Sequence, residues 1–596
     1  MRDTLIDDRT VDFLLWDVLD AGALLALPPF AEHDRATLGA YVDLCRRFAR
    51  EVLLPTYKLL DAEPPVFDGE RVRVHPRLHE VWPRLKELGI IAASRPFDVG
   101  GQQLPFTVSL AGTLYVMAGN CPVYSYAGLT TGAAHLVEAF GSEDLKGRYL
   151  PLLHEGTWTG TMALTEPQAG SSLSDVATTA TPSGGHYLVS GSKMFISGGD
   201  HDLAENIVHM VLARIPGAPA GVKGISLFLV PKLRPEGKAL VPNDVRVTGL
   251  IHKMGWRALP ATALSFGEAG DCRGFLVGEP NRGLAYMFQM MNEARVIVGA
   301  DAVASASAAY RQSLAYALER PQGRPLASKD PAQPQVPIVE HADVRRMLLR
   351  QKSIVEGGLA LLLQVAKLAD LAEHAPEPAE RQRAQLLLDL LTPVAKTFPA
   401  ERGFEANALA VQVHGGYGYS TEYSPEAYLR DQKLNSIHEG TTGIQGLDLL
   451  GRKVTAAKGA ALGALAAEVS AACARAGEAG VDPSWIAAVR EAGTKVGALT
   501  KELGAKGVAG DVEAMLLHAT DYLDLFSTWV VAWQWLNVAA AAREALARGS
   551  APEPFCRGKL AAAQYFIRTE LPRVDHLAAL CRDGEDSYAR ARPDWF

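Results

Sequence analysis

The chain changes character at Thr161-Met-Ala-Leu-Thr-Glu-Pro-Gln-Ala-Gly-Ser-Ser172, where a helical pattern gives way to strands. Before this stretch, apolar residues in 38–54 and 78–88 recur at steps of three and four, which is the period of an amphipathic helix. After it, short apolar runs alternate with Gly, Pro, Asn and Asp as far as about residue 283. This order predicts a helical domain followed by an all-β domain.

The β region contains four runs with strand character: 187–196, 207–214, 224–230 and 261–266. In the third run, Ile225, Leu227 and Leu229 lie on one face, as the two-residue period of a strand requires. Runs of this length and spacing predict a sandwich or a barrel. The sequence shows no strand–helix–strand alternation, which disfavours a doubly wound parallel sheet.

Helical periodicity returns after residue 283 and continues to the end of the chain. Val355, Leu359 and Leu362 belong to a clear apolar stripe, and 321–337 is a Pro-rich loop. The expected fold class is therefore α+β multidomain. Its predicted parts are an N-terminal α-helical domain at 1–160, a middle β domain at 161–283, an α-helical bundle at 284–455 and an extra C-terminal α-helical module at 456–596.

The composition limits the classes of partner. Of the 596 residues, 48% are apolar and 21% are charged, which is ordinary for a folded soluble protein. The net charge of −8 gives no general attraction for phosphate backbones. The module at 456–596 carries 15 Lys and Arg against 17 Asp and Glu, so it is not a basic arm. We expect no nucleic-acid partner.

Cysteine usage and the N-terminus bear on the compartment. The six cysteines are far apart and form no CxxC pair, which favours a reducing compartment over a zinc site or a disulfide framework. Asp3, Asp7 and Asp8 stand where a secretory signal would be basic. An uncharged stretch at 525–542 approaches spanning length, but polar residues interrupt it and its tryptophans recur at helical spacing. We expect a cytoplasmic protein without a membrane span.

The stretch 161–172 has the composition of an anion-binding loop. Pro167, Gly170 and two small hydroxyl residues can present backbone N–H groups to an anion, although a plain strand connection has the same composition. A strand is predicted shortly downstream, at Lys193-Met-Phe-Ile-Ser-Gly-Gly199. Its Phe195 could stack on a flat cofactor or pack in the core.

A glycine cluster occurs at Gln412-Val-His-Gly-Gly-Tyr-Gly-Tyr419, followed by Arg430-Asp431. It resembles a phosphate-binding loop. However, no strand–turn–helix pattern surrounds it, so the dinucleotide-binding fingerprint fails here. A glycine cluster by itself is most often only a turn.

The third motif is Ser436-Ile-His-Glu-Gly-Thr-Thr-Gly-Ile-Gln445. Thr442 and Gln445 have the spacing of a capping box, which predicts a helix that begins at Thr442. Glu439 would then lie just outside a helix N-terminus, where a carboxylate either complements the helix dipole or takes part in chemistry. His438 is expected to be structural or to line a pocket.

Taken together and in this order, the segments from about 38 to 454 resemble the acyl-CoA dehydrogenase family of flavoproteins. Residues 13–30 and 456–596 further resemble the branch of that family with a C-terminal helical extension. The resemblance implies a helical domain, a middle β domain and a four-helix bundle, with FAD as the cofactor. It also implies a homo-oligomer, in which the extra module covers the surface used for tetramerisation and leaves a dimer.

The resemblance assigns roles to the residues that match the family motifs. It implies FAD contacts for Leu164, Thr165, Gly170, Ser171, Phe195, Ser197, Arg320, Gln412, Gly416, Gly440 and Thr441. Phe195 and Ser197 would flank the flavin ring, and Arg320 would reach the FAD of the facing subunit.

The resemblance also implies acyl-CoA contacts for Ser171, Arg295, Asn292 and Tyr126, and a catalytic base at Glu439. In the family, the base removes a proton from Cα while a hydride passes from Cβ to the flavin, which gives the trans-2-enoyl-CoA. Electron-transfer flavoprotein is the implied electron acceptor. The acyl group itself stays open.

Two departures from the family pattern stand out. Ser172 occupies the place of a usual aspartate, with Asp175 as a possible substitute, and His438 replaces a common tyrosine. Three other functions stay open: an acyl-CoA oxidase that uses O₂, a DNA-associated flavoprotein of the alkylation-response branch, and a silent scaffold that keeps FAD as a prop. The charge count disfavours the DNA-associated function, and the presence of Glu439 argues against the scaffold.

Overall fold

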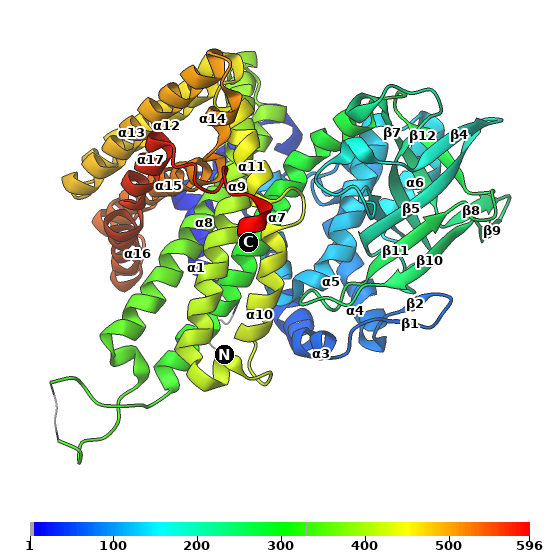
Figure 1. Ribbon diagram of the computed structural model, residues 1–596. Helices are drawn as coiled ribbons and strands as arrows, with labels where there is room; N and C mark the ends of the chain where they lie inside the picture. The colour runs from blue at the N-terminus through cyan, green and yellow to red at the C-terminus, as the bar shows by residue number, and fades with distance from the viewer. Residues whose placement is uncertain (1–4, 328–329) are drawn as a thin grey trace. The chain divides into compact units, whose positions relative to one another are not determined.

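The computed structural model describes residues 5–327 and 330–596, and it leaves the side chains of 288–292 outside the description. The chain folds into two compact units. The bundle unit consists of residues up to Arg35, Phe106–Ala111 and Arg295–Phe596. The β unit consists of Ala36–Pro105 and Gly112–Ala294. Figure 1 shows the chain coloured from its N-terminus to its C-terminus.

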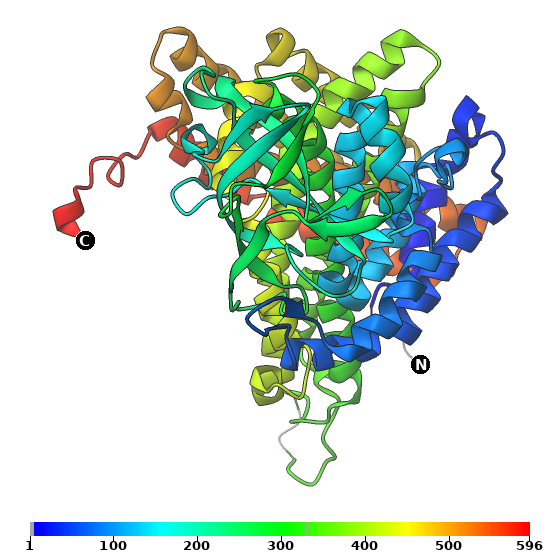
Figure 2. The same cartoon turned by 90° about the vertical axis from the view of Figure 1, so that its right-hand side faces the viewer.

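The β unit is built around one sheet of eight strands. These are β3 (Trp158–Ala163), β4 (Thr179–Ser183), β5 (His186–Ser197), β6 (Asn206–Arg214), β7 (Ile225–Pro231), β10 (Val245–Leu250), β11 (Ala261–Phe266) and β12 (Arg273–Val277). The pairs β5–β12, β12–β7, β7–β6, β6–β4 and β4–β5 close a ring, and β11 and β10 extend it from β5 (Figure 2). The predicted sandwich or barrel is therefore a small barrel, and only β3 and one bridge of β4 run parallel to a neighbour.

Both faces of the central strands are buried, which explains their near-continuous apolar sequence. Every residue of β7 is buried. On one face, Leu227 and Leu229 belong to a core shared with helices α5 (Phe106–Phe140) and α6 (Glu143–His154). On the other face, Phe228 and Val230 pack into the interior of the barrel. The alternating side chains of 224–230 therefore lie in two different cores, one on each face of β7. Neither face is exposed to solvent.

The remaining elements of the β unit are short or helical. They are α2 (Arg35–Phe48), α3 (Tyr57–Ala62), α4 (Pro76–Glu87) and the two hairpins β1–β2 (Val66–Phe67, Val72–Arg73) and β8–β9 (Leu233–Glu236, Ala239–Pro242). Within the described residues, α5 alone has the length and hydropathy of a membrane span, and 94% of its most apolar window is buried. The stretch 525–542, which approaches spanning length, lies in α15 (Ala519–Arg548). It is largely buried and does not reach the hydropathy of a membrane span.

Long helices dominate the bundle unit. They are α7 (Gly283–Glu319, from Arg295 onward), α8 (Ala342–His374) and α9 (Pro378–His414), joined by the shorter α1 (Asp8–Phe13), α10 (Pro425–Gln432) and α11 (Thr442–Asp448). The predicted stripe on α8 is confirmed, because Val355, Leu359 and Leu362 are buried. Gly299 lets α7 approach α9 closely, since a Cβ atom there would lie 2.0 Å from the Ala395 carbonyl oxygen.

The C-terminal module belongs to the same compact unit as the bundle. It comprises α12 (Ala460–Glu478), α13 (Pro483–Val508), α14 (Val512–Leu516), α15, α16 (Glu553–Tyr565) and α17 (Arg573–Asp583). Helix α15 docks on α8: the Trp535 indole N–H donates to the Ser353 carbonyl at 3.0 Å, and Gly357 leaves room for that ring. The four-domain division of the sequence stays a prediction.

Candidate active site

In the β unit, one buried lysine supports the turn that follows β3. Glu166 and Ala169 exchange two backbone hydrogen bonds of 2.9 and 3.0 Å, which leaves Pro167 and Gln168 at the tip of the turn. The Lys193 ammonium, on β5, donates to Glu166 Oε1 at 2.8 Å and to the Leu164 carbonyl oxygen at 3.0 Å. The backbone of this turn is therefore fixed at both ends.

Both charges of that pair are buried, since Lys193 is 1% and Glu166 is 4% exposed. Burial alone would raise the pKa of the Glu166 carboxyl, but the Lys193 ammonium and hydrogen bonds from Thr178 and Ala177 outweigh it and lower that pKa to about 2. Burial lowers the pKa of the Lys193 ammonium to about 8, against the pull of Glu166. The pair is ionised at neutral pH.

The predicted FAD-contacting residues of this turn are all at least partly exposed. Leu164 and Thr165 are half-buried, while Gly170 and Ser171 are exposed. The Ser172 hydroxyl donates to Asp175 Oδ2 at 2.7 Å. Asp175 thus interacts with the residue that replaces the family aspartate.

Phe195 departs from the core packing that was one of its two predicted environments. It is 60% exposed and has a φ of +60° in the left-handed region. The cause is a bulge, because Met194 and Phe195 on β5 stand opposite the single residue Ala263 on β11. The bulge turns the ring outward beside the half-buried Ser197, so Phe195 offers a free aromatic face.

In the bundle unit, Glu439 lies in the loop just before α11. Its backbone has a φ of +52°, an unusual conformation for a residue with a side chain. The Gln445 amide donates to the carbonyl oxygens of Glu439 and Gly440, at 3.2 and 3.3 Å. Helix α11 begins at Thr442 as predicted, but the predicted cap was wrong by one residue: the Thr441 hydroxyl accepts from Ile444 N at 3.4 Å. These contacts fix the strained loop.

The electrostatic environment of Glu439 favours a carboxyl group that titrates above its ordinary range. Burial raises the pKa of the Glu439 carboxyl, and the positive charges of Arg295 and Lys396 oppose that rise. Its neighbour His438 has its pKa lowered to about 3 by burial and by Lys396, so the imidazole is neutral. A half-buried carboxyl of this kind is suited to accept a proton.

Arg295, predicted to contact CoA, is engaged within the protein. It is 3% exposed and donates to Asp448 Oδ2 on α11 at 2.7 Å. Asp448 also forms an ion pair of 2.6 Å with Arg452. These contacts make Arg295 a support for α11, and its CoA contact stays a prediction. The side chain of Asn292 lies outside the described residues.

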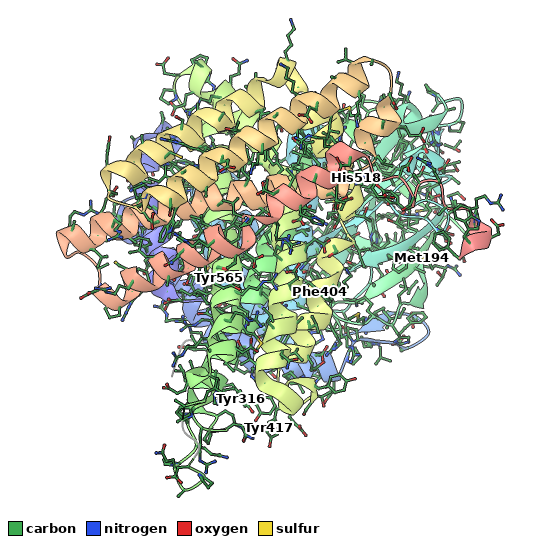
Figure 3. All side chains as sticks on the ribbon, turned by 60° about the vertical axis from the view of Figure 1, so that its left-hand side comes forward. Met194, Tyr316, Phe404, Tyr417, His518 and Tyr565 are labelled. Atoms are coloured by element: carbon green, nitrogen blue, oxygen red, sulfur yellow. The ribbon has the colours of Figure 1, made fainter. Side chains whose placement is uncertain are left out.

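The structure brings Arg320 and the glycine cluster together at one end of the bundle. The Arg320 guanidinium lies 5.9 Å from the centroid of the Tyr417 ring, near Tyr316, which Figure 3 also labels. Arg320, Gln412 and Gly416 are all exposed. Helix α9 ends at His414, and the next residue, Gly415, has a φ of +61° and a ψ of −136°, which suit glycine alone. This end of the bundle therefore presents a cation beside an exposed backbone turn.

Tyr126, predicted to contact the substrate, is a packed residue of the β unit. It is 2% exposed, and its hydroxyl donates to the Ala258 carbonyl at 3.0 Å. Its ring meets His201 edge to face at 5.1 Å between centroids. This environment favours a structural role, and the substrate contact stays a prediction.

The predicted site residues therefore form two groups, one in each unit. The β unit holds the turn 164–171, Phe195, Ser197 and Tyr126. The bundle unit holds Arg295, Arg320, Gln412, Gly416 and the segment 439–441. Sequence reasoning missed Lys396, Glu166 and Lys193 as supports of these groups. A lysine inside an otherwise apolar strand or helix face was the available signal.

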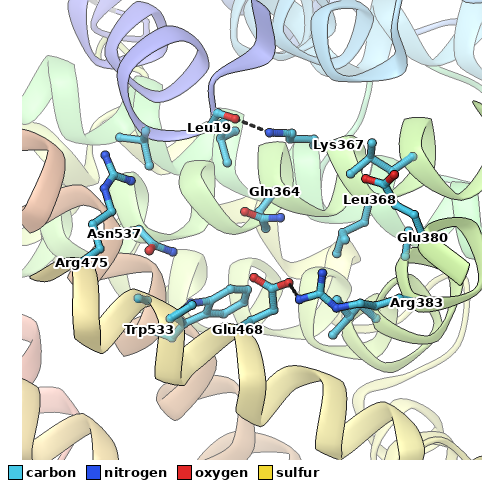
Figure 4. Close-up of a pocket in the computed structure, with 16 residues that line it drawn as sticks. Leu19, Gln364, Lys367, Leu368, Glu380, Arg383, Glu468, Arg475, Trp533 and Asn537 are labelled. Carbon is cyan, nitrogen blue, oxygen red and sulfur yellow. Dashed lines mark hydrogen bonds and ion pairs between the residues drawn. The ribbon is translucent and has the colours of Figure 1, made fainter. Parts of the chain in front are cut away.

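A large cavity of the bundle unit lies away from these residues. Its volume is about 450 Å³, and α8, α9, α12 and α15 line it together with Leu19 (Figure 4). None of the predicted site residues lines it. Two of the cations that line it have partners: Arg383 pairs with Glu468, and Lys367 donates to the Leu19 carbonyl oxygen.

The described residues contain no group of three or more His, Cys, Asp or Glu side chains placed to bind a metal ion. All six cysteines are buried, and none of them forms a disulfide.

Four family models match the chain in sequence order. They are described as acyl-CoA dehydrogenase N-terminal domain (residues 37–157), middle domain (161–269) and C-terminal domain (281–454), followed by acetyl-CoA dehydrogenase C-terminal like (465–592). Together they account for most of the chain, including the extra module.

Two curated relatives are similar over nearly their whole length. The 3-methylmercaptopropionyl-CoA dehydrogenase of Ruegeria pomeroyi is 39% identical over 576 residues, which cover 95% of this chain and 96% of the relative. A butyryl-CoA dehydrogenase of Syntrophomonas wolfei is 33% identical over 585 residues, which cover 95% of each chain.

One solved structure spans both units and the module. Caenorhabditis elegans ACDH-11 in complex with C11-CoA gives a TM-score of 0.74 at 17% identity, covering 100% of this chain and 97% of that chain. At this identity, the likeness supports the fold alone.

Proposed function

The chain belongs to the acyl-CoA dehydrogenase family, and we propose that it oxidises the Cα–Cβ bond of an acyl-CoA thioester to the trans-2-enoyl-CoA with Glu439 as the base. The family and its relatives make the chain an oxidoreductase that acts on CH–CH groups. The observation that carries the assignment of the base is the environment of Glu439. It is a half-buried carboxyl whose pKa burial raises, held on a strained backbone at the start of α11.

Removing two hydrogens from adjacent saturated carbons requires a base for one and a hydride acceptor for the other. A carboxylate in water is too weak a base, but enclosure raises its proton affinity toward the working pH. Glu439 takes the Cα proton as its carboxylate becomes a carboxylic acid. His438 beside it does not compete for that proton, because burial and the charge of Lys396 lower its pKa to about 3 and make it a weak base.

The residues of the chain fit the FAD that the family implies. When bound, FAD accepts the hydride from Cβ. In the β unit, the outward ring of Phe195 offers a stacking surface, and the turn 164–171 offers backbone N–H groups. In the bundle unit, exposed Arg320 offers a cation to a pyrophosphate. Leu164, Thr165 and Ser197 are further residues of the β unit for which we propose a contact with FAD.

The family resemblance supports the proposed partners, and the cysteine usage supports the proposed compartment. We propose electron-transfer flavoprotein as the acceptor, a homodimer as the assembly and the cytoplasm as the location. An oxidase would instead pass the electrons to O₂. Peroxide release, compared with the reduction of an electron-transfer dye under the same conditions, separates these two outcomes.

The test uses Glu439→Gln, which keeps the size of the side chain and removes its basicity. We expect this variant to retain FAD and to lose flavin bleaching by acyl-CoA by about 10³-fold, the usual range for loss of a general base. Glu478→Gln, exposed on α12, is the matched control. Thioesters named by the relatives, butyryl-CoA and 3-methylmercaptopropionyl-CoA, begin the substrate panel. Normal anaerobic bleaching in Glu439→Gln would exclude this residue as the base.

A further inference from the structure

Lys396 is a buried cation with an unusual lack of contacts. It lies on α9 between Pro393 and Pro399, and none of its side chain is exposed. Its ammonium has no hydrogen-bond partner among the residues whose side chains the structure describes. Burying an ammonium without a partner is strongly unfavourable, so this arrangement does not stabilise the fold.

The other buried lysines show what a structural lysine does in this protein. The described part of the chain buries three lysines, and the other two are Lys193 and Lys559. Lys193 lies 2.8 Å from a Glu166 oxygen, and Lys559 lies 2.9 Å from a Glu356 oxygen. Lys396 alone among the three has no carboxylate at hydrogen-bond distance.

The charged groups around Lys396 indicate the carboxyl on which its ammonium acts. It acts electrostatically with Glu401 on its own helix, with Arg295 on α7 and with Glu439 before α11. Glu401 accepts a hydrogen bond from the Thr442 hydroxyl at the start of α11. The charge of Arg295 is compensated by its 2.7 Å contact with Asp448. Of the two carboxyls in this group, Glu439 is the one for which the described residues give no side-chain hydrogen bond.

We propose that the buried ammonium of Lys396 keeps the Glu439 side chain ionised, so that the carboxylate is ready to take a proton from the substrate. This inference rests on the proposed role of Glu439 as the base. Lys396 is a positioning residue in this sense, because it acts through Glu439.

The lack of a direct contact is what makes this arrangement useful. A salt bridge would occupy a lone pair of the Glu439 carboxylate and depress its basicity strongly. An ammonium held near it, but not hydrogen-bonded to it, offsets part of the effect of burial and leaves both oxygens free for the substrate. His438 stays neutral in the same field and so adds no second positive charge beside Glu439.

The experiment compares Lys396→Met, which removes the charge, with Lys396→Arg, which keeps it. Lys433→Met is the matched control: it also removes one cation, but Lys433 lies over the Phe404 ring at 5.2 Å and is not among the charges that shift Glu439. The holoenzyme forms are titrated with pH in two ways. One follows the anaerobic rate of flavin reduction by acyl-CoA. The other follows the carboxyl C=O stretch of Glu439 by infrared difference against Glu439→Gln, without substrate.

We expect Lys396→Met to move the midpoint of both titrations upward by about one pH unit, which is the size of a single nearby charge at an effective dielectric constant of about 20. Lys396→Arg should restore most of the shift, and Lys433→Met should leave the midpoints in place. If Lys396→Met folds poorly, Lys396→Gln gives the same comparison. Unchanged midpoints in a folded, flavin-loaded variant would overturn the inference. Because the infrared titration needs no turnover, it decides the role of Lys396 even if Glu439 is not the base.

Discussion

The Lys193 ammonium lies 2.8 Å from Glu166 Oε1 and 3.0 Å from the Leu164 carbonyl oxygen, so one buried cation joins a side chain and a backbone group of the same turn. Glu166 in turn accepts the N–H groups of Ala177 and Thr178, at 2.7 and 3.0 Å. The turn that we propose as part of the FAD site is therefore tied to the strands on both sides of it.

Lys193→Met should loosen this turn. Removing one partner of a buried ion pair leaves the other charge uncompensated, which costs about 3 kcal/mol of unfolding free energy. We also expect FAD affinity to fall about 10-fold, since Leu164 and Thr165 lose their support. Urea unfolding and the fluorescence of released flavin measure the two effects. FAD retention equal to that of the native protein would show that the pair supports the fold only.

The same pair predicts a loss of stability in acid. The folded-state pKa of Glu166 is lowered from 4.5 to about 2, so its contribution is fully present above pH 4.5 and is lost as the pH falls toward 2. In Glu166→Gln, the stability difference from the native protein should shrink across that window. Urea midpoints at pH 5 and pH 3 provide the test, and parallel curves for the two proteins would contradict it.

Gly440→Ala should disturb the loop that carries Glu439. The added Cβ would lie 2.6 Å from the Gln445 amide nitrogen, and the φ of +91° disfavours any side chain. We expect a cost of about 1–3 kcal/mol and slower flavin reduction. Gly443→Ala is the matched control, because the nearest atom to its Cβ is 3.9 Å away and its φ is not positive. Equal effects of the two substitutions would refute this reading of the loop.

Arg320→Ala should weaken FAD retention without unfolding the bundle. Arg320 is exposed and lies beside Tyr417, so its loss removes a cation but little packing. The expected result is lower flavin content after gel filtration at an unchanged melting temperature. Arg557→Ala, another exposed arginine, serves as the control. Full flavin content in Arg320→Ala would count against its contact with the cofactor.

Lys559→Met should destabilise the bundle unit strongly. Lys559 is buried, lies 2.9 Å from Glu356 and donates to the Thr10 hydroxyl at 2.6 Å, so it links α16 to α8 and α1. We expect a loss of about 3 kcal/mol. Lys495→Met removes a surface ion pair with Asp575 and should cost at most about 1 kcal/mol. Similar losses in the two variants would mean that burial of the Lys559 pair is unimportant.

Local sequence rules succeeded where the signal was periodic. The run 261–266 coincides with β11, and α11 begins at Thr442, as the capping-box spacing of Thr442 and Gln445 predicted. The rules failed by one residue at the cap, because either threonine can accept an N–H and only the path of the chain selects Thr441. They left Phe195 undecided because an outward ring depends on a bulge against β11, which is a partner distant in sequence.

The sequence by itself determined the order of the helical and β regions, which depends on residue types at fixed spacing, and its motifs indicated the family by resemblance. The choice of Glu439 as the proposed base came from that resemblance. Only the tertiary structure decided that Lys396 is buried without a partner near Glu439, while Lys193 and Lys559 are paired. The physical reason is that the charge state and the desolvation of a side chain depend on what other segments place around it. Spacing along one segment does not contain that information.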